Sequence, residues 1–221
     1  MRKLFPVLAA VTAIVFATTP FLIANAPYES TMLLIQKIFY YHVPSWVAMY
    51  CGLGVCAVGS ALYLFKNSRA GDRYAEAAAE LIVVFAGNGL ISGPLWARKA
   101  WGVWWQWDAR LTIALLVWLI FVAYLMVRKY GGPGSEKLAA AVGIFGAAVS
   151  PFLYFSVTIW RTIHPPTSVV PDIIENPKGM AAPLLVSMLA FVLLFVLLLN
   201  LRVRLAERQD ALDDLYLTLE D

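Results

Sequence analysis

The sequence predicts an all-α integral membrane protein, a bundle of six transmembrane helices with a tryptophan-rich outer loop. Hydrophobic residues make up 61% of its 221 residues, charged residues make up 14%, and the mean hydropathy is +0.73. Soluble domains contain about 45–50% apolar and about 25% charged residues, so this chain has too few polar side chains to cover itself in water. The apolar residues also fall in long runs separated by short polar turns, which indicates a single membrane domain over residues 1–221.

Six apolar stretches have about the length that crosses a bilayer. A helix rises about 1.5 Å per residue, so about 20 residues span a hydrocarbon core of about 30 Å. The fourth stretch is the shortest of the six. The predicted spans are Leu4–Ala24, Pro44–Phe65, Ala75–Leu95, Leu111–Val127, Leu138–Trp160 and Ala181–Leu201.

The first span resembles a cleavable signal peptide, because Arg2 and Lys3 precede it and small residues follow it at Ala24-Asn25-Ala26. Its apolar stretch is nevertheless longer than the usual ~7–15 residues of such a segment. Pro27 also falls just after the cleavage point, where proline disfavours cleavage. We therefore expect this span to be retained.

The basic residues predict the orientation. With both termini in the cytoplasm, the outer loops are Asn25–Val43, Trp96–Arg110 and Arg161–Met180, and residues 202–221 form a cytoplasmic tail that extends the last helix. Six of the 17 lysine and arginine residues then lie outside, and the other 11 lie inside, in agreement with the positive-inside rule. The inside residues are Arg2, Lys3, Lys66, Arg69, Arg73, Arg128, Lys129, Lys137, Arg202, Arg204 and Arg208.

The two histidines of the chain, His42 and His164, are both expected at the outer face. His42 lies just before Pro44, a residue that suits a helix start, and His164 follows the fifth span. A lone histidine at a membrane boundary is usually only a polar side chain near the headgroups. Two histidines on one face, from different helices, can instead occupy both axial positions of a haem iron.

Residues 96–110 lie between these histidines and contain five of the eight tryptophans. An aromatic belt at the membrane interface is one explanation, but a belt distributes tryptophans over both interfaces. Indole rings beside cations alternatively suit a flat, apolar, anionic ligand such as a porphyrin, whose propionates bind arginine or lysine. The candidate contacts are Trp101, Trp104, Trp105 and Trp107 for the macrocycle and Arg98, Lys99, Arg110 and Arg161 for the carboxylates.

Asp108 has a different expected role within this segment. A carboxylate repels an anionic ligand, so Asp108 is better suited to orient Arg110 or to cap the helix that follows. The two cysteines, Cys51 and Cys56, form neither a C-x-x-C nor a C-x-x-C-H motif, which excludes a c-type cytochrome, and we expect them to pack between helices.

The segment from Trp101 to Thr112, WGVWWQWDARLT, resembles the tryptophan-rich "WWD" signature of haem-handling membrane proteins. Within that group the chain resembles the CcmC family, the haem exporter or haem-transfer subunit of cytochrome c maturation system I. Residues 41–46 (YHVPSW) and 163–166 (IHPP) resemble the family's two outer histidine segments.

The resemblance implies that His42 and His164 are the axial ligands of a non-covalently bound, b-type haem, and that the WWD segment, including Asp108, holds the macrocycle. It implies four partners: an ABC ATPase subunit, a membrane partner subunit, a small single-helix subunit and a periplasmic haem chaperone. It also implies a bacterial inner-membrane location and a transfer subunit without catalytic residues, with ATP hydrolysed by the partner.

Two other functions stay open on the sequence. A haem lyase, or cytochrome c synthetase, needs a large soluble outer segment that binds apocytochrome, and the outer loops are short. A b-type electron carrier usually buries its histidine pairs within the spans, whereas both histidines here are expected at one boundary.

Overall fold

A computed structural model describes residues 4–166, 168–175 and 178–220. Six helices in this part of the chain are long and apolar enough to cross a membrane, and it contains no β-strand. The prediction of an all-α membrane protein with six spans is therefore confirmed. The elements are α1 (Phe5–Asn25), the 3-10 helix η1 (Leu34–Ile38), α2 (Phe39–Lys66), α3 (Arg69–Ala100), α4 (Ala109–Tyr130), α5 (Ser135–Ile159), α6 (Val169–Glu175) and α7 (Ala181–Glu220).

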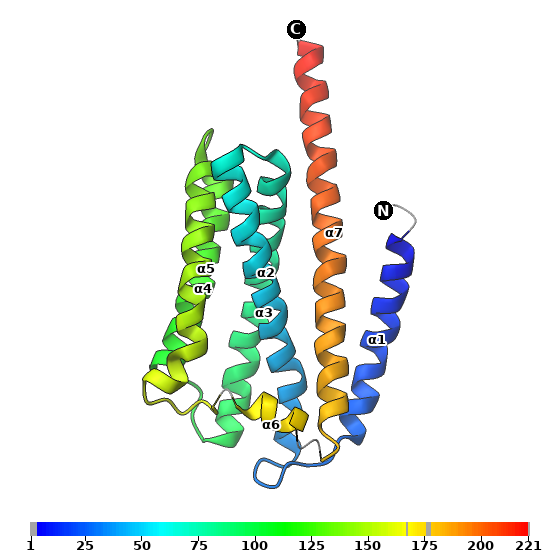
Figure 1. The fold of residues 1–221 in the computed structure, drawn as a ribbon, viewed down its shortest axis with the longest axis vertical. Helices are drawn as coiled ribbons and strands as arrows, with labels where there is room; N and C mark the ends of the chain where they lie inside the picture. Colours follow the sequence, from blue (N-terminus) through cyan, green and yellow to red (C-terminus); the bar gives the residue numbers. More distant parts are fainter. Residues whose placement is uncertain (1–3, 167, 176–177, 221) are drawn as a thin grey trace.

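The helices form a four-helix group and an attached pair (Figure 1). Helices α2 to α5 pack against one another, α1 packs along α7, and α7 contacts α2 and α3. The short elements η1 and α6 lie at one end, which we call the site end, and both termini point toward the other, the termini end. Helix α7 has 40 residues and so measures about 60 Å, which carries it well beyond the rest of the bundle.

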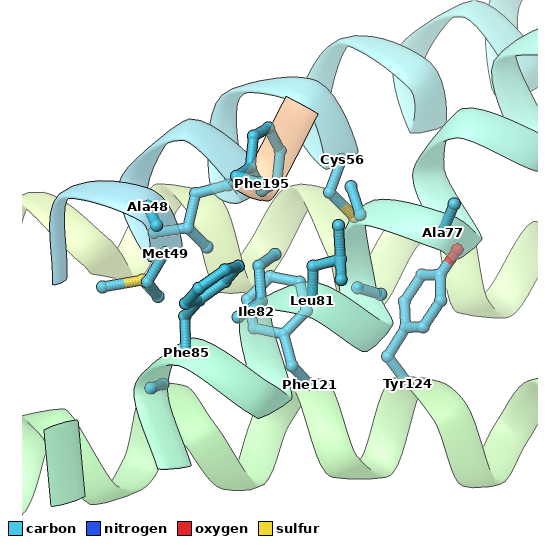
Figure 2. Packing of buried hydrophobic residues seen from close by; sticks show 14 of the residues in the cluster. Ala48, Met49, Cys56, Ala77, Leu81, Ile82, Phe85, Phe121, Tyr124 and Phe195 are labelled. Carbon is cyan, nitrogen blue, oxygen red and sulfur yellow. The ribbon is translucent and has the colours of Figure 1, made fainter. Parts of the chain in front are cut away.

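The core of the bundle joins α2, α3, α4 and α7 (Figure 2). Met49, Ile82 and Phe121 are fully buried there, and Phe195 of α7 reaches the same cluster. Small residues let the backbones approach: a Cβ added at Gly59 would lie 2.5 Å from the Gly71 carbonyl oxygen. Cys56 is also buried in this cluster, and Cys51 is partly buried; neither forms a disulfide.

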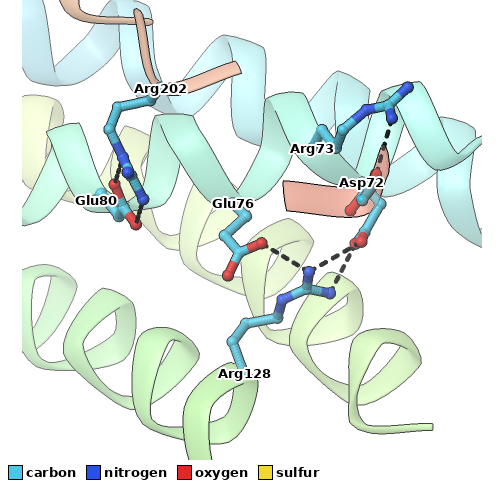
Figure 3. Close-up of polar contacts among 7 residues, drawn as sticks. Asp72, Arg73, Glu76, Glu80, Arg128 and Arg202 are labelled. Atoms are coloured by element: carbon cyan, nitrogen blue, oxygen red, sulfur yellow. Dashed lines mark hydrogen bonds and ion pairs between the residues drawn. The ribbon is translucent and has the colours of Figure 1, made fainter. Parts of the chain in front are cut away.

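Ion pairs connect the helices toward the termini end (Figure 3). Arg128 of α4 contacts Asp72 at 2.9 Å and Glu76 at 2.7 Å, both on α3. Glu80, an acidic residue within the third span, pairs with Arg202 of α7. Because these charges lie in apolar segments, pairing them is what makes their position tolerable.

The helices extend beyond the predicted spans, and the extensions of α2 and α3 bear on the site. Helix α2 begins at Phe39 and continues through Pro44, so His42 lies within the helix instead of before it. Pro44 is the sixth residue of α2, beyond the first turn, so it costs the helix the backbone hydrogen bond to the Tyr40 carbonyl. Helix α3 continues to Ala100, so Trp96 is helical and the irregular part of the tryptophan segment covers residues 101–108.

Candidate functional site

The two histidines line the same hollow at the site end. A cavity of about 750 Å³ and a smaller one of about 60 Å³ lie side by side there, sharing much of their lining. Small-molecule sites measure about 300–1,000 Å³, so the larger cavity has room for a ligand of cofactor size. Residues common to both linings include His42, His164, Arg110, Trp46, Tyr50 and Trp96.

His42 is buried against α3, and both of its ring nitrogens have partners. Its Nδ1 lies 2.9 Å from the Ser92 hydroxyl, and its Nε2 accepts a hydrogen bond of 3.2 Å from the indole N–H of Trp46. Ser92 donates its own proton to the Asn88 carbonyl, so its oxygen is left to accept from His42. These contacts fix the tautomer that carries its proton on Nδ1 and its lone pair on Nε2.

His164 lies in the irregular segment between α5 and α6. Its Nδ1 is 2.8 Å from the Pro165 carbonyl oxygen, an acceptor, so Nδ1 carries the proton and the Nε2 lone pair is available. Burial, assisted by the positive charge of Arg110, lowers the pKa of His164 to about 4, so the ring is neutral near pH 7. A neutral imidazole with its Nδ1–H held by a carbonyl is the usual state of a metal-ligating histidine.

Asp108 ties the tryptophan segment to the loop of His164. One carboxylate oxygen caps α4 by accepting the Leu111 backbone N–H at 2.9 Å, so the capping role expected for it is observed. The other oxygen accepts from the Thr162 hydroxyl and from the Ile163 backbone N–H at 3.1 Å. The Thr162 oxygen in turn accepts the backbone N–H of His164 at 3.1 Å. Asp108 therefore positions His164, and it lies outside the residues that line either cavity.

The predicted tryptophans divide into two groups. Trp101, Trp104 and Trp105 line the smaller cavity, and Trp101 stacks on Trp96 with ring centroids 6.4 Å apart. Trp96 itself meets the His42 ring edge to face at 5.7 Å, so a continuous aromatic wall leads to the histidine. Trp107 is 76% exposed and contacts Trp105, and it lines neither cavity.

Among the four predicted cations, Arg110 alone lines the cavities. Its guanidinium donates to the carbonyl oxygens of Leu153 and Tyr154 on α5, which holds it in place. Arg98 is exposed and donates to the Gly102 carbonyl oxygen at 2.6 Å, so it stabilises the turn after α3. Lys99 and Arg161 are exposed outside both cavities.

Trp46 and Tyr50 line both cavities but were not predicted as ligand contacts. They follow His42 at four and eight residues along α2, which places all three on one face of the helix. The Tyr50 hydroxyl and the Trp105 indole nitrogen are buried and have no hydrogen-bond partner among the described residues. Two unpaired donors beside Arg110 suit a ligand that brings acceptor oxygens.

Glycines on α3 create the space for this face of α2. A Cβ at Gly93 would lie 3.3 Å from the His42 ring, and a Cβ at Gly89 would lie 2.5 Å from the Trp46 ring. Because residues four apart share a helix face, Gly89 and Gly93 form one groove for both rings. The G-x-x-x-G spacing was the available signal for this close approach.

We expect Gly89→Ala to destabilise the protein, because the methyl group would overlap the rigid indole of Trp46. Overpacking costs about 1–3 kcal/mol, equivalent to a fall of about 2–12 °C in the thermal midpoint. The midpoint in detergent measures this effect. Gly87→Ala on the same helix is the matched control, since its Cβ would make only an ordinary 3.5 Å contact with Trp118. Equal midpoints for the two variants would contradict the proposed packing.

Comparisons with known proteins agree with the family resemblance of the sequence. Residues 1–214 match the family model CcmC, described as heme exporter protein C. The chain is 36% identical to heme exporter protein C of Bradyrhizobium diazoefficiens over 200 residues, 89% of this chain and 76% of that protein. It is 27% identical to heme exporter protein C of Haemophilus influenzae, over 92% of this chain and 84% of the relative. A putative cytochrome c biosynthesis ccmC-like mitochondrial protein of Marchantia polymorpha is 30% identical, over 60% of this chain and 57% of the relative.

Proposed function

Since the chain belongs to the CcmC family of heme exporter proteins, multi-pass membrane proteins of cytochrome c maturation, we propose that it binds haem between His42 and His164 and passes it to a periplasmic haem chaperone. The haem is cargo, bound non-covalently as a b-type haem with both histidines as axial ligands. The site end then faces the periplasm and both termini face the cytoplasm, which agrees with the excess of basic residues near the termini end.

One observation carries this proposal: two neutral histidines from distant parts of the chain line one largely apolar cavity with their Nδ1 protons held by oxygen acceptors. That arrangement leaves the two Nε2 atoms as the nitrogens suited to bind iron. The aromatic wall of Trp96 and Trp101 suits the macrocycle, and Arg110 suits a propionate.

The family membership also supports the proposed assembly. We propose an ABC ATPase subunit, a membrane partner subunit and a small single-helix subunit as the complex in which the chain works. The ATPase supplies the energy for haem release, and this chain supplies the site. The bacterial inner membrane is the proposed location.

An absorption spectrum of the detergent-purified chain with added haem tests the function. We expect a Soret band and low-spin bands in the oxidised and reduced states. After a periplasmic haem chaperone is added, the haem should pass from this chain to the chaperone. Acid–acetone extraction should remove all the haem, because the bond is non-covalent. Haem that resists extraction would instead support a haem lyase, and no haem binding at all would contradict the proposal.

We expect Tyr50→Phe to weaken haem binding by about 2–10-fold, because a donor that faces the propionate region is lost. Haem titration followed at the Soret band measures the change. Tyr124→Phe is the matched control, since its hydroxyl is also buried and unpaired among the described residues but lies in the helix core. Iron octaethylporphyrin, which has no propionates and no oxygen acceptor, should bind wild type and Tyr50→Phe equally; a persisting difference would rule out a propionate contact.

A further inference from the structure

The Nε2 atom of His42 is already engaged in the haem-free protein. The indole N–H of Trp46, one helical turn along α2, donates to it at 3.2 Å. A ring nitrogen has a single lone pair, so it cannot accept this hydrogen bond and bind iron at the same time. The Nδ1 atom offers no alternative, because its proton is directed at the Ser92 oxygen.

We propose that Trp46 is a positioning residue that competes with haem iron for His42 and so makes the bound haem easier to release. This inference rests on the proposed haem-binding function. On haem entry the N–H···N hydrogen bond breaks and an iron–Nε2 bond forms, while the Nδ1 proton stays on His42 and no proton is transferred. On release the indole N–H regains its partner, which offsets part of the cost of breaking the iron bond.

The surroundings of Trp46 favour such a competition. Its ring packs in the groove at Gly89, so the indole is held beside His42. Trp46 lines a largely apolar cavity, where a donor displaced from its acceptor is costly to leave unpaired. The wild-type protein therefore loses a hydrogen bond whenever haem binds, and a variant without the indole N–H does not.

Replacing Ser92 should change haem affinity in the opposite direction from replacing Trp46, although both residues act on the His42 ring. Its oxygen holds the Nδ1 proton and thereby keeps the lone pair on Nε2. Without that acceptor, neither the tautomer nor the orientation of the ring is fixed. The bond between a metal and such a histidine is then weaker. Purely structural roles would make both substitutions weaken haem binding, so the difference in sign identifies the competition.

The haem-free protein allows a first test that needs no ligand. In ¹⁵N-histidine-labelled wild type, the His42 Nε2 resonance should show a hydrogen-bonded acceptor, and in Trp46→Phe it should move toward the value of an unbonded imidazole nitrogen. Trp118→Phe is the matched control, because its indole N–H also makes a buried helix–helix hydrogen bond, to the Val83 carbonyl at 3.0 Å. An unchanged His42 signal in Trp46→Phe would overturn the proposal.

Haem titration and haem dissociation provide the second test. Trp46→Phe should bind haem about 2–10-fold more tightly than wild type and release it correspondingly more slowly, the range expected for one hydrogen bond. Ser92→Ala should bind more weakly, and Trp118→Phe should match wild type. Weaker or unchanged binding by Trp46→Phe, with wild type binding normally, overturns the competition alone. Failure of wild type itself to bind haem overturns the proposed function.

Discussion

Replacing both His42 and His164 with alanine is expected to abolish the low-spin haem spectrum while leaving the protein inserted in the membrane. Both proposed Nε2 ligands are lost, and the chain contains no other histidine to replace them. Each single variant should retain one ligand and give a high-spin, five-coordinate spectrum. Removing a residue that merely supports a ligand costs about 10–100-fold in metal affinity, so losing a ligand should cost at least as much.

Added imidazole provides the control for this result. It should restore low-spin bands in His42→Ala or His164→Ala by entering the space that the side chain leaves, provided the fold is intact. Cys51→Ala, a substitution on α2 outside both cavities, should keep the wild-type spectrum. Wild-type haem retention in the double variant would show that the iron is bound elsewhere.

Asp108→Ala is expected to reduce haem affinity by about 10–100-fold even though Asp108 lines neither cavity. The substitution removes the cap of α4, which costs about 0.5–2 kcal/mol, and it also releases Thr162 and Ile163 from the carboxylate. The loop that carries His164 then loses its attachment to the tryptophan segment. The spectrum should change from low-spin to mixed-spin as the His164 bond weakens.

Two further substitutions separate the cap from the attachment of the loop. Asp108→Asn keeps an oxygen to cap α4 but lacks a second acceptor for the loop, so it should restore stability without restoring haem affinity. Thr162→Val removes the hydroxyl between Asp108 and His164 and should reproduce the affinity loss without destabilising α4. Full recovery of haem binding in Asp108→Asn would show that only the cap matters.

The six helices were predictable because a membrane leaves few alternatives. Backbone groups in the hydrocarbon core must pair within the segment, so long apolar runs form helices. Helix ends are governed by weaker local preferences, which explains why Pro44 was expected to begin α2 but lies inside it. The short helix α6 was not predicted either; it has seven residues, none of them fully buried, which is too short for a helical period to show in the sequence.

The candidate site was predicted as far as unusual residue types could indicate it. His42, His164 and Arg110 stand out in an apolar chain, and all three line the cavities. Trp46 and Tyr50 do not stand out, because aromatic residues in a transmembrane helix usually pack in the core. The contact between Asp108 and Thr162 joins residues 54 positions apart, and no local pattern encodes such a pairing.

The two histidines are supported differently, and this difference has a consequence for how a bound metal leaves. His42 is fixed in a helix against the glycine groove of α3, whereas His164 lies on a loop attached through Asp108. For a haem bound as proposed, His42 and His164 form a chelate in which one ligand is on a rigid helix and the other is on a loop. While His42 stays bound, a dissociated His164 rebinds rapidly because its effective concentration is high. An acceptor ligand can replace His164 while it is dissociated; the iron–His42 bond then breaks as Trp46 regains its hydrogen bond to His42, so the haem passes to the acceptor without an aqueous intermediate.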